Sequence, residues 1–179
     1  CRNAEHSCIK QEKSSLCRLV VLGMMTKVTN PRIEVSIGTQ TLSLCDGHRV
    51  VGTWPCSTSK FGIGFEEGSN KTPLGGFVVA EKFGEEAESG TIFKARKPVG
   101  HWSPGDPAEE DLILTRILRL RGLEKRNANT FDRYIYIHGT NEEHRMGRKG
   151  SHGCIRMANR DIMELFDRVP EGTTVWIEA

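Results

Sequence analysis

Two short stretches decide how this chain is interpreted: residues 134–140, YIYIHGT, and residues 151–157, SHGCIRM. The first is aromatic and β-branched, which predicts a buried strand over residues 134–137 that delivers His138 at its end. The second places Cys154 directly after a glycine and two residues after His152. Together they predict a site built from a thiol and an imidazole.

A thiol is a useful nucleophile only as thiolate. Because the pKa of a free thiol is roughly 8.5, a nearby imidazole, cation or backbone donor has to favour the thiolate. His138 and His152 are both candidates for that imidazole. Gly139 and Gly153 carry no side chain, so a substrate backbone can approach and amide N–H groups can point inward. We expect the N–H groups of Gly153 and Cys154 to face the negative charge that develops on an attacked carbonyl oxygen.

Two further interpretations stay open at this site. Arg156 can bind a carboxylate bidentately, or it can be a salt-bridged arginine of a sheet. A metal site built from His138, His144, His152 and Cys154 is the other possibility. The chain lacks H-x-x-x-H and C-x-x-C spacing, so the sequence favours no metal.

The rest of the chain predicts a mainly β fold with one helix near its C-terminal end. Asp46-Gly47, between two alternating runs, is a strong hairpin signal. The apolar residues of segment 112–120 fit both the two-residue period of a strand and the spacing of a helix, and the neighbouring β signals favour a strand. Asn159 is expected to cap a helix that Pro170 and Gly172 stop. The remaining expected strands cover residues 33–37, 41–44, 50–54, 77–80 and 174–177, with a loop over 61–70.

Residues 84–111 are rich in glycine, proline and acidic side chains, which predicts a long irregular loop. Phe93 and Trp102 would be poor choices for a merely solvated loop. We expect both to pack towards the cleft, as part of a wall or flap that governs which acceptor is used; a plain surface excursion is the alternative.

Composition excludes several classes. The 179 residues carry 25 basic and 23 acidic side chains without a basic block, which argues against nucleic acid as a partner. The longest apolar run, residues 19–25, is far below the ~20 residues of a transmembrane segment. One domain over residues 31–179, preceded by an extension of unreadable role over 1–30, is expected.

Six cysteines are too few and too irregular for a disulfide scaffold. Cys8 and Cys17 could pair in an oxidising compartment, whereas Cys154 has to stay free. Cys1 is expected to mark a chain boundary, with a lipid-anchored terminus as the other possibility.

The chain resembles the YkuD-type L,D-transpeptidases over roughly residues 31–178. The residues that carry the resemblance are Ser57-Thr58-Ser59, Lys71-Thr72-Pro73-Leu74-Gly75, His138-Gly139-Thr140 and Ser151-His152-Gly153-Cys154-Ile155-Arg156-Met157. It implies a β-sandwich-like catalytic fold over 31–179, with Cys154 as nucleophile, His138 as general base and the Gly139 carbonyl orienting the imidazole. By the same match, Ser151, His152, Gly153 and Arg156 form the substrate-binding and oxyanion pocket.

Cys45, Cys56 and the segment before Pro31 depart from what we expect of this family. The departures leave the proposed catalytic set intact.

The resemblance also implies the reaction. Peptidoglycan tetrapeptide stems would be donor and acceptor, with release of terminal D-alanine and formation of a cross-link. Hydrolysis of the same bond, as an L,D-carboxypeptidase, and a catalytically silent peptidoglycan-binding module are the alternatives. Carbapenem-type inhibitors should acylate the thiol, no cofactor is required, and the protein should be periplasmic or otherwise exported to the cell envelope.

Overall fold

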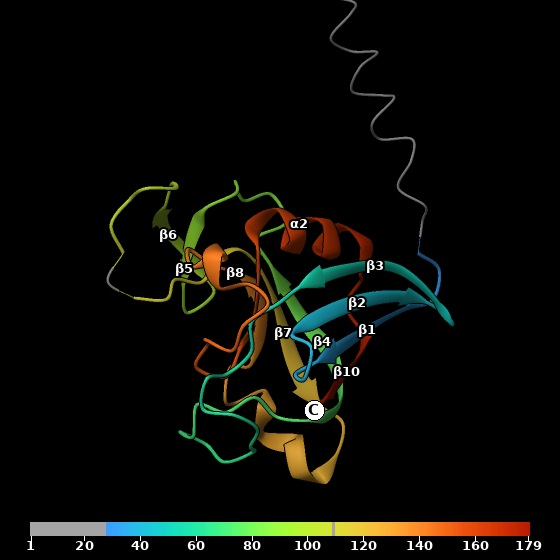
Figure 1. Ribbon diagram of the computed structural model, residues 1–179. Coiled ribbons are helices and arrows are strands. Elements are labelled where there is room, and N and C mark those ends of the chain that lie inside the picture. The colour runs from blue at the N-terminus through green and yellow to red at the C-terminus, as the bar shows by residue number, and fades with distance from the viewer. Residues whose placement is uncertain (1–27, 109) are drawn as a thin grey trace, which may run out of the picture.

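The computed structural model describes residues 28–108 and 110–179. Nearly all of the expected extension over 1–30, including Cys1, Cys8 and Cys17, lies outside them. Ten strands form one sheet (Figure 1). They are β1 (Pro31–Ser36), β2 (Thr41–Asp46), β3 (Arg49–Pro55), β4 (Gly75–Phe83), β5 (Thr91–Lys94), β6 (Lys97–His101), β7 (Leu114–Gly122), β8 (Tyr136–Gly139), β9 (Ile155–Met157) and β10 (Thr174–Glu178).

The sheet is mixed, in the order β3-β2-β1-β10-β4-β7-β5-β6, and β8 pairs with β7 and β9. The pairs β1/β10 and β8/β9 are parallel and the others are antiparallel. The prediction of a mainly β fold with one helix is confirmed: α2 (Asn159–Arg168) is the one α-helix of the described residues. Two 3-10 turns, Lys125–Thr130 and Glu143–Arg145, complete the structure.

The predicted hairpin is present between β2 and β3. Gly47 has φ +59°, a conformation that glycine adopts at little cost. The Asp46 carboxylate accepts N–H bonds from Thr29 and Asn30, at 3.1 and 2.8 Å. These contacts fix the chain at the entrance to β1.

Helix α2 buries Ile162, Leu165 and Phe166 against the sheet and contacts β7 and β8 (Figure 1). Its predicted cap is wrong, because Ala158 occupies the capping position and Asn159 is the first helical residue. The Asn159 side chain bonds to neighbouring loops instead, for a reason given below. None of the helices in the described part of the chain has the length and apolar character that crossing a membrane requires.

The expectation of an irregular loop over residues 84–111 is wrong in part, because β5 and β6 form a hairpin there. Its turn carries two consecutive non-glycine residues of positive φ, Ala95 at +48° and Arg96 at +66°. No glycine or asparagine marks the turn in the sequence, so the usual hairpin signal was missing.

Strand β7 settles the ambiguous segment as a strand, and it is not regular. Its pairing with β8 shifts between Leu114 and Ile117, which is a bulge. At the bulge the buried Thr115 has φ +70°, which is unfavourable for a β-branched residue. The bulge lies opposite the end of β8, where His138 and Gly139 stand.

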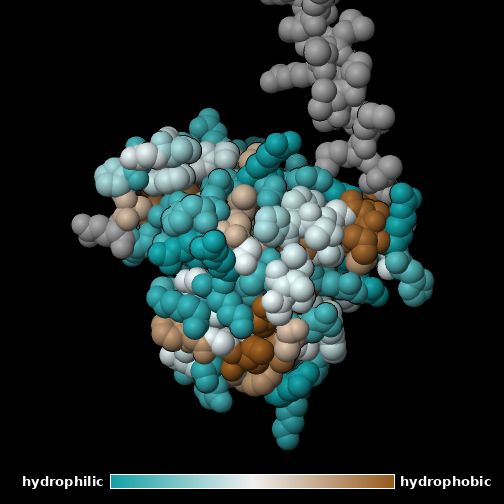
Figure 2. Space-filling view, viewed as in Figure 1, coloured by the Kyte–Doolittle hydropathy of each residue, from teal (hydrophilic) through white to brown (hydrophobic). Residues whose placement is uncertain are grey.

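The larger hydrophobic core is formed by side chains of the sheet and of α2, and it includes Cys56. Burial raises the pKa of the Cys56 thiol to about 12, which makes it an inert, small apolar side chain. The face of the molecule shown in Figure 2 is mostly hydrophilic, with hydrophobic colour confined to separate areas. A second, smaller cluster lies beside β5 and contains Phe93, Ile117 and Tyr136, with Ile113 and Cys154 packed against it.

Candidate active site

Parallel pairing of β8 and β9 brings together the two stretches that the sequence singled out. Ile137 pairs with Ile155, and His138 with Arg156. Cys154 immediately precedes β9, so it lies beside the start of β8, where its Sγ contacts the backbone of Tyr134 and Tyr136. Two segments separated by the loop 140–150 thereby form a single site.

His138 is almost fully buried, with 3% of its surface exposed. Its Nδ1 lies 2.7 Å from the Gly139 carbonyl oxygen. A carbonyl can only accept, so Nδ1 carries the proton and Nε2 is left as the basic nitrogen. Burial lowers the pKa of His138, and the opposing effects of Asp111 and the Gly139 carbonyl are smaller. The imidazole is therefore neutral at pH 7 and able to accept a proton.

Position 139 accepts only glycine. A Cβ there would lie 2.8 Å from the Leu114 carbonyl oxygen and closer still to Oδ1 of Asn159. Both neighbours are held in place, so the backbone at 139 would have to move. A shift of that carbonyl would remove the contact that fixes the imidazole.

Asn159 is a site residue that the sequence did not reveal. Its amide donates to the Thr140 carbonyl at 2.9 Å and to Glu143 at 2.7 Å. Its oxygen accepts from the Thr115 hydroxyl at 2.6 Å, and Thr115 in turn accepts from the Gly90 N–H at 2.9 Å. This network joins the strained bulge of β7, the helix and the loop after β8 around the backbone of residues 139–140.

Cys154 is partly exposed, and its Sγ lies 3.4 Å from both the Tyr134 carbonyl oxygen and the Tyr136 N–H. Burial raises the pKa of the thiol to about 11, while the Tyr136 N–H and Arg133 act in the lowering direction. The S–H therefore donates to Tyr134 in the resting state. Burial thus favours the neutral forms of both the thiol and the imidazole.

The turn before the nucleophile is built by hydroxyl groups. Ser151 Oγ donates to the Cys154 carbonyl at 2.5 Å and accepts the Gly153 N–H at 3.3 Å. Thr72 Oγ1 donates to the Gly153 carbonyl at 3.0 Å, which explains why the Lys71-Thr72-Pro73 segment matters to the site. Gly153 has φ +121°, so the turn requires glycine. Because the Gly153 N–H already has a partner, an oxyanion at this point has to compete with Ser151 for it.

His152 is exposed, and its ring contacts Phe61. Its ring centroid is 5.6 Å from that of Phe61, over which the Lys60 ammonium lies at 5.2 Å. These contacts place the side chain on the outer wall formed by residues 60 and 61. Its role in the pocket stays a prediction.

Arg156 is fully buried and lies between two carboxylates. Its Nη1 pairs with Asp111 at 3.0 Å and with Glu142, and its Nη2 donates to Ser57 at 3.0 Å. A substrate carboxylate would have to displace these internal partners. The structure thus favours the salt-bridged interpretation, and Asp111 and Glu142 join the site as residues that the sequence did not single out.

Among residues 28–108 and 110–179, no three His, Cys, Asp or Glu side chains are grouped closely enough to hold a metal ion. His144 is exposed within the 3-10 turn after Glu142. It lies outside the contacts that hold His138 and Cys154.

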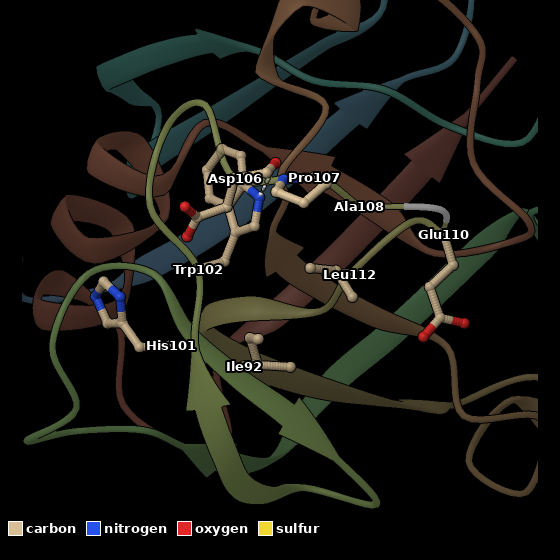
Figure 3. Close-up of a pocket in the computed structure, with 8 residues that line it drawn as sticks. All are labelled: Ile92, His101, Trp102, Asp106, Pro107, Ala108, Glu110 and Leu112. Carbon is tan, nitrogen blue, oxygen red and sulfur yellow. Dashed lines mark hydrogen bonds between the residues drawn. The ribbon is translucent and has the colours of Figure 1, made fainter.

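A separate hollow of about 680 Å³ lies beside the β5–β6 hairpin (Figure 3). Trp102 lines it and donates from Nε1 to the Asp106 carbonyl at 3.2 Å. Ile92 and Leu112 also line it, whereas their neighbours Phe93 and Ile113 pack in the cluster of Cys154. Side chains alternate along β5, so Phe93 points into the cluster against which Cys154 packs, as expected. Trp102, which was expected to pack towards the same cleft, lines the separate hollow instead.

We expect His138→Ala to slow single-turnover acylation by about 10² to 10⁴-fold, because the basic nitrogen held by the Gly139 contact is lost. His144→Ala is the matched control and should leave the rate little changed. Because burial lowers the pKa of His138, the wild-type rate should persist below pH 6.5 and fall only under more acidic conditions, where the imidazole becomes protonated. Equal losses in the two variants would show that His138 is not the base.

The family model described as YkuD, L,D-transpeptidase catalytic domain, matches residues 30–177 of this chain. YkuD of Bacillus licheniformis, whose name assigns it to the L,D-transpeptidases, is 31% identical over 160 residues. The match covers 89% of this chain and 73% of the relative.

Solved structures share the fold. An L,D-transpeptidase from Xylanimonas cellulosilytica superposes with a TM-score of 0.56 at 20% identity, covering 84% of this chain and 61% of that one. The L,D-transpeptidase LdtMt1, solved in complex with imipenem, gives a TM-score of 0.54 at 20% identity. That match covers 83% of this chain and 59% of that one, so this chain spans about three-fifths of these structures.

Proposed function

The chain belongs to the L,D-transpeptidase catalytic-domain family, and from that premise we propose that Cys154 and His138 transfer acyl groups between peptidoglycan stem peptides. The observation that carries the proposal is the neutral, buried His138, whose Nδ1 is held by the Gly139 carbonyl beside the strand that follows Cys154. A binding module without catalysis would need neither a thiol nor an imidazole with a fixed basic nitrogen on two paired strands.

The first half-reaction acylates the enzyme. His138 Nε2 takes the proton of the Cys154 thiol as sulfur attacks the carbonyl of the third residue of a tetrapeptide stem. The C–N bond to the terminal D-alanine breaks, and the imidazolium returns its proton to the departing amine. A thioester and free D-alanine result.

The second half-reaction resolves the thioester. The amine of a second stem attacks it, His138 accepts the amine proton, and the Cys154 sulfur leaves and is reprotonated. The product is a direct cross-link between two third-position residues. Water in place of the amine would give the L,D-carboxypeptidase product from the same thioester.

The resting state affects the timing of proton transfer. Burial favours the neutral forms of both groups, since the pKa of the thiol is raised and that of the imidazole is lowered. The proton should therefore move as the S–C bond forms, without a stable thiolate-imidazolium pair beforehand. No cofactor is needed for these steps.

We also place the protein in the periplasm or elsewhere in the cell envelope. Peptidoglycan stems lie outside the cytoplasmic membrane, and acyl transfer requires access to them.

The test combines a donor and an inhibitor. The full chain should release D-alanine from a disaccharide-tetrapeptide donor and form a cross-linked product detected by mass spectrometry. A carbapenem such as imipenem should add one inhibitor mass per chain, mapped to the peptide with Cys154. Donor and inhibitor both left unmodified, with the chain folded, would contradict the proposal.

A further inference from the structure

Four arginines surround the start of β8 and the nucleophile, and two of them have acidic partners. Arg119 pairs with Glu81 at 2.9 Å, and Arg156 pairs with Asp111 and Glu142. Arg96 and Arg133 form no ion pair within 4.0 Å among residues 28–108 and 110–179.

Arg96 reaches the site from the β5–β6 turn. Its Nη1 donates to the Tyr136 hydroxyl at 3.1 Å, and its guanidinium lies 5.4 Å from the ring centroid of Tyr134. These are the two residues whose backbone atoms contact the Cys154 sulfur. Tyr134 is 52% exposed and Arg96 is partly exposed, so this contact lies at the surface of the molecule.

The turn that presents Arg96 is strained. Ala95 and Arg96 both have positive φ, a backbone conformation that residues other than glycine rarely adopt. Such a conformation persists when the surroundings hold it. The contacts of Arg96 with the two tyrosines supply that hold. Among residues 28–108 and 110–179, Arg96 donates one side-chain hydrogen bond, to Tyr136, so its other guanidinium N–H groups are available to a ligand.

Arg133 differs, because its charge is used to hold a loop. Its Nη2 donates to the Lys71 carbonyl at 2.7 Å, and its Nη1 donates to the Gly64 carbonyl at 3.3 Å. These partners are neutral, and the carboxylates of Glu66 and Glu67 act on its charge from beyond ion-pair distance. Arg133 acts on the nucleophile by lowering the pKa of the Cys154 thiol, whereas Arg96 keeps N–H groups that can bind a ligand.

We propose that Arg96 binds a carboxylate of the acyl donor, so that the site selects donors with a free carboxylate near the scissile carbonyl. The inference rests on the proposed function and assigns its substrate class. Arg96 thereby takes the carboxylate-binding role considered for Arg156, because the Arg156 guanidinium is already paired with Asp111 and Glu142. A planar guanidinium with free N–H pairs matches a carboxylate bidentately.

The first test needs no enzyme turnover. Alkylation of Cys154 by iodoacetate, an anion, is compared with alkylation by neutral iodoacetamide, with the Cys154 peptide quantified by mass spectrometry. Arg96→Gln should lower the iodoacetate-to-iodoacetamide rate ratio about three- to tenfold at low salt, and added salt should shrink the difference. Lys97→Gln removes one charge from the same hairpin and should change the ratio less than about twofold. Equal ratios in wild type and Arg96→Gln would overturn the inference.

The second test uses donor peptides with either a free carboxylate or an amide. Arg96→Gln should raise KM about tenfold for the carboxylate donor and leave the amide donor unaffected, because a charge-assisted hydrogen bond is lost only for the former. Arg96→Lys should recover part of the loss, and kcat should change little. A loss that is the same for both donors would overturn the inference.

The two readouts separate the inference from the proposed function. If wild-type enzyme turns over neither donor but the alkylation ratio still depends on Arg96, the acyl-transfer proposal fails and the anion site stands. If donors are turned over and neither readout changes in Arg96→Gln, the acyl-transfer proposal stands and the anion site at Arg96 is excluded. Circular dichroism of each variant confirms that the sheet is retained.

Discussion

Cys154→Ala is expected to reduce D-alanine release at least about 10⁴-fold, because no other group at that point can form the acyl-enzyme. The fold should survive. Sγ makes only two contacts of 3.4 Å, and the side chain packs at the edge of the smaller cluster. The measurement is D-alanine release under single-turnover conditions, with circular dichroism to verify folding.

Cys45→Ala is the matched control for that variant. Cys45 is a buried thiol whose pKa is raised by burial, and it lies in β2, away from the site. Its loss should lower stability slightly and leave turnover unchanged. Substantial D-alanine release by Cys154→Ala, with Cys45→Ala behaving as expected, would exclude Cys154 as the nucleophile.

Arg156→Met is expected to lower the free energy of unfolding by about 3 to 5 kcal/mol, the range for breaking a buried ion pair from one side. Asp111 and Glu142 would be left without their shared cation. The loop after β8 depends on both residues. The Thr140 hydroxyl donates to the Asp111 carboxylate at 3.1 Å, and the same hydroxyl oxygen accepts the Glu142 N–H at 3.0 Å. Urea unfolding followed by tryptophan fluorescence measures the loss.

Arg148→Met is the control, because Arg148 is an exposed arginine of the same loop and its removal should change stability by less than about 0.5 kcal/mol. Adding Glu142→Gln to Arg156→Met should recover part of the stability, since one of the unpaired charges is then removed. A stable Arg156→Met variant with a raised KM would instead support the interpretation that Arg156 binds a substrate carboxylate.

Local patterns were enough to predict several elements. The alternation in residues 31–37 and the Asp46-Gly47 turn predicted β1 and the β2–β3 hairpin, since period and turn chemistry are properties of neighbouring residues. The helical spacing of Ile162, Leu165 and Phe166 predicted α2 for the same reason. The hairpin of β5 and β6 was missed because its turn, Ala95-Arg96, uses an unfavourable backbone conformation that no residue type announces.

The sequence by itself determined which groups are available for the proposed chemistry: a thiol at 154, an imidazole at 138 and glycines beside both. Only the tertiary structure decided the partners. Arg156 meets Asp111 and Asn159 meets Thr115 across separations of about 45 residues, which no local pattern encodes. It also decided the charge states, because the pKa of a thiol or an imidazole depends on how much water and which charges the fold leaves around it.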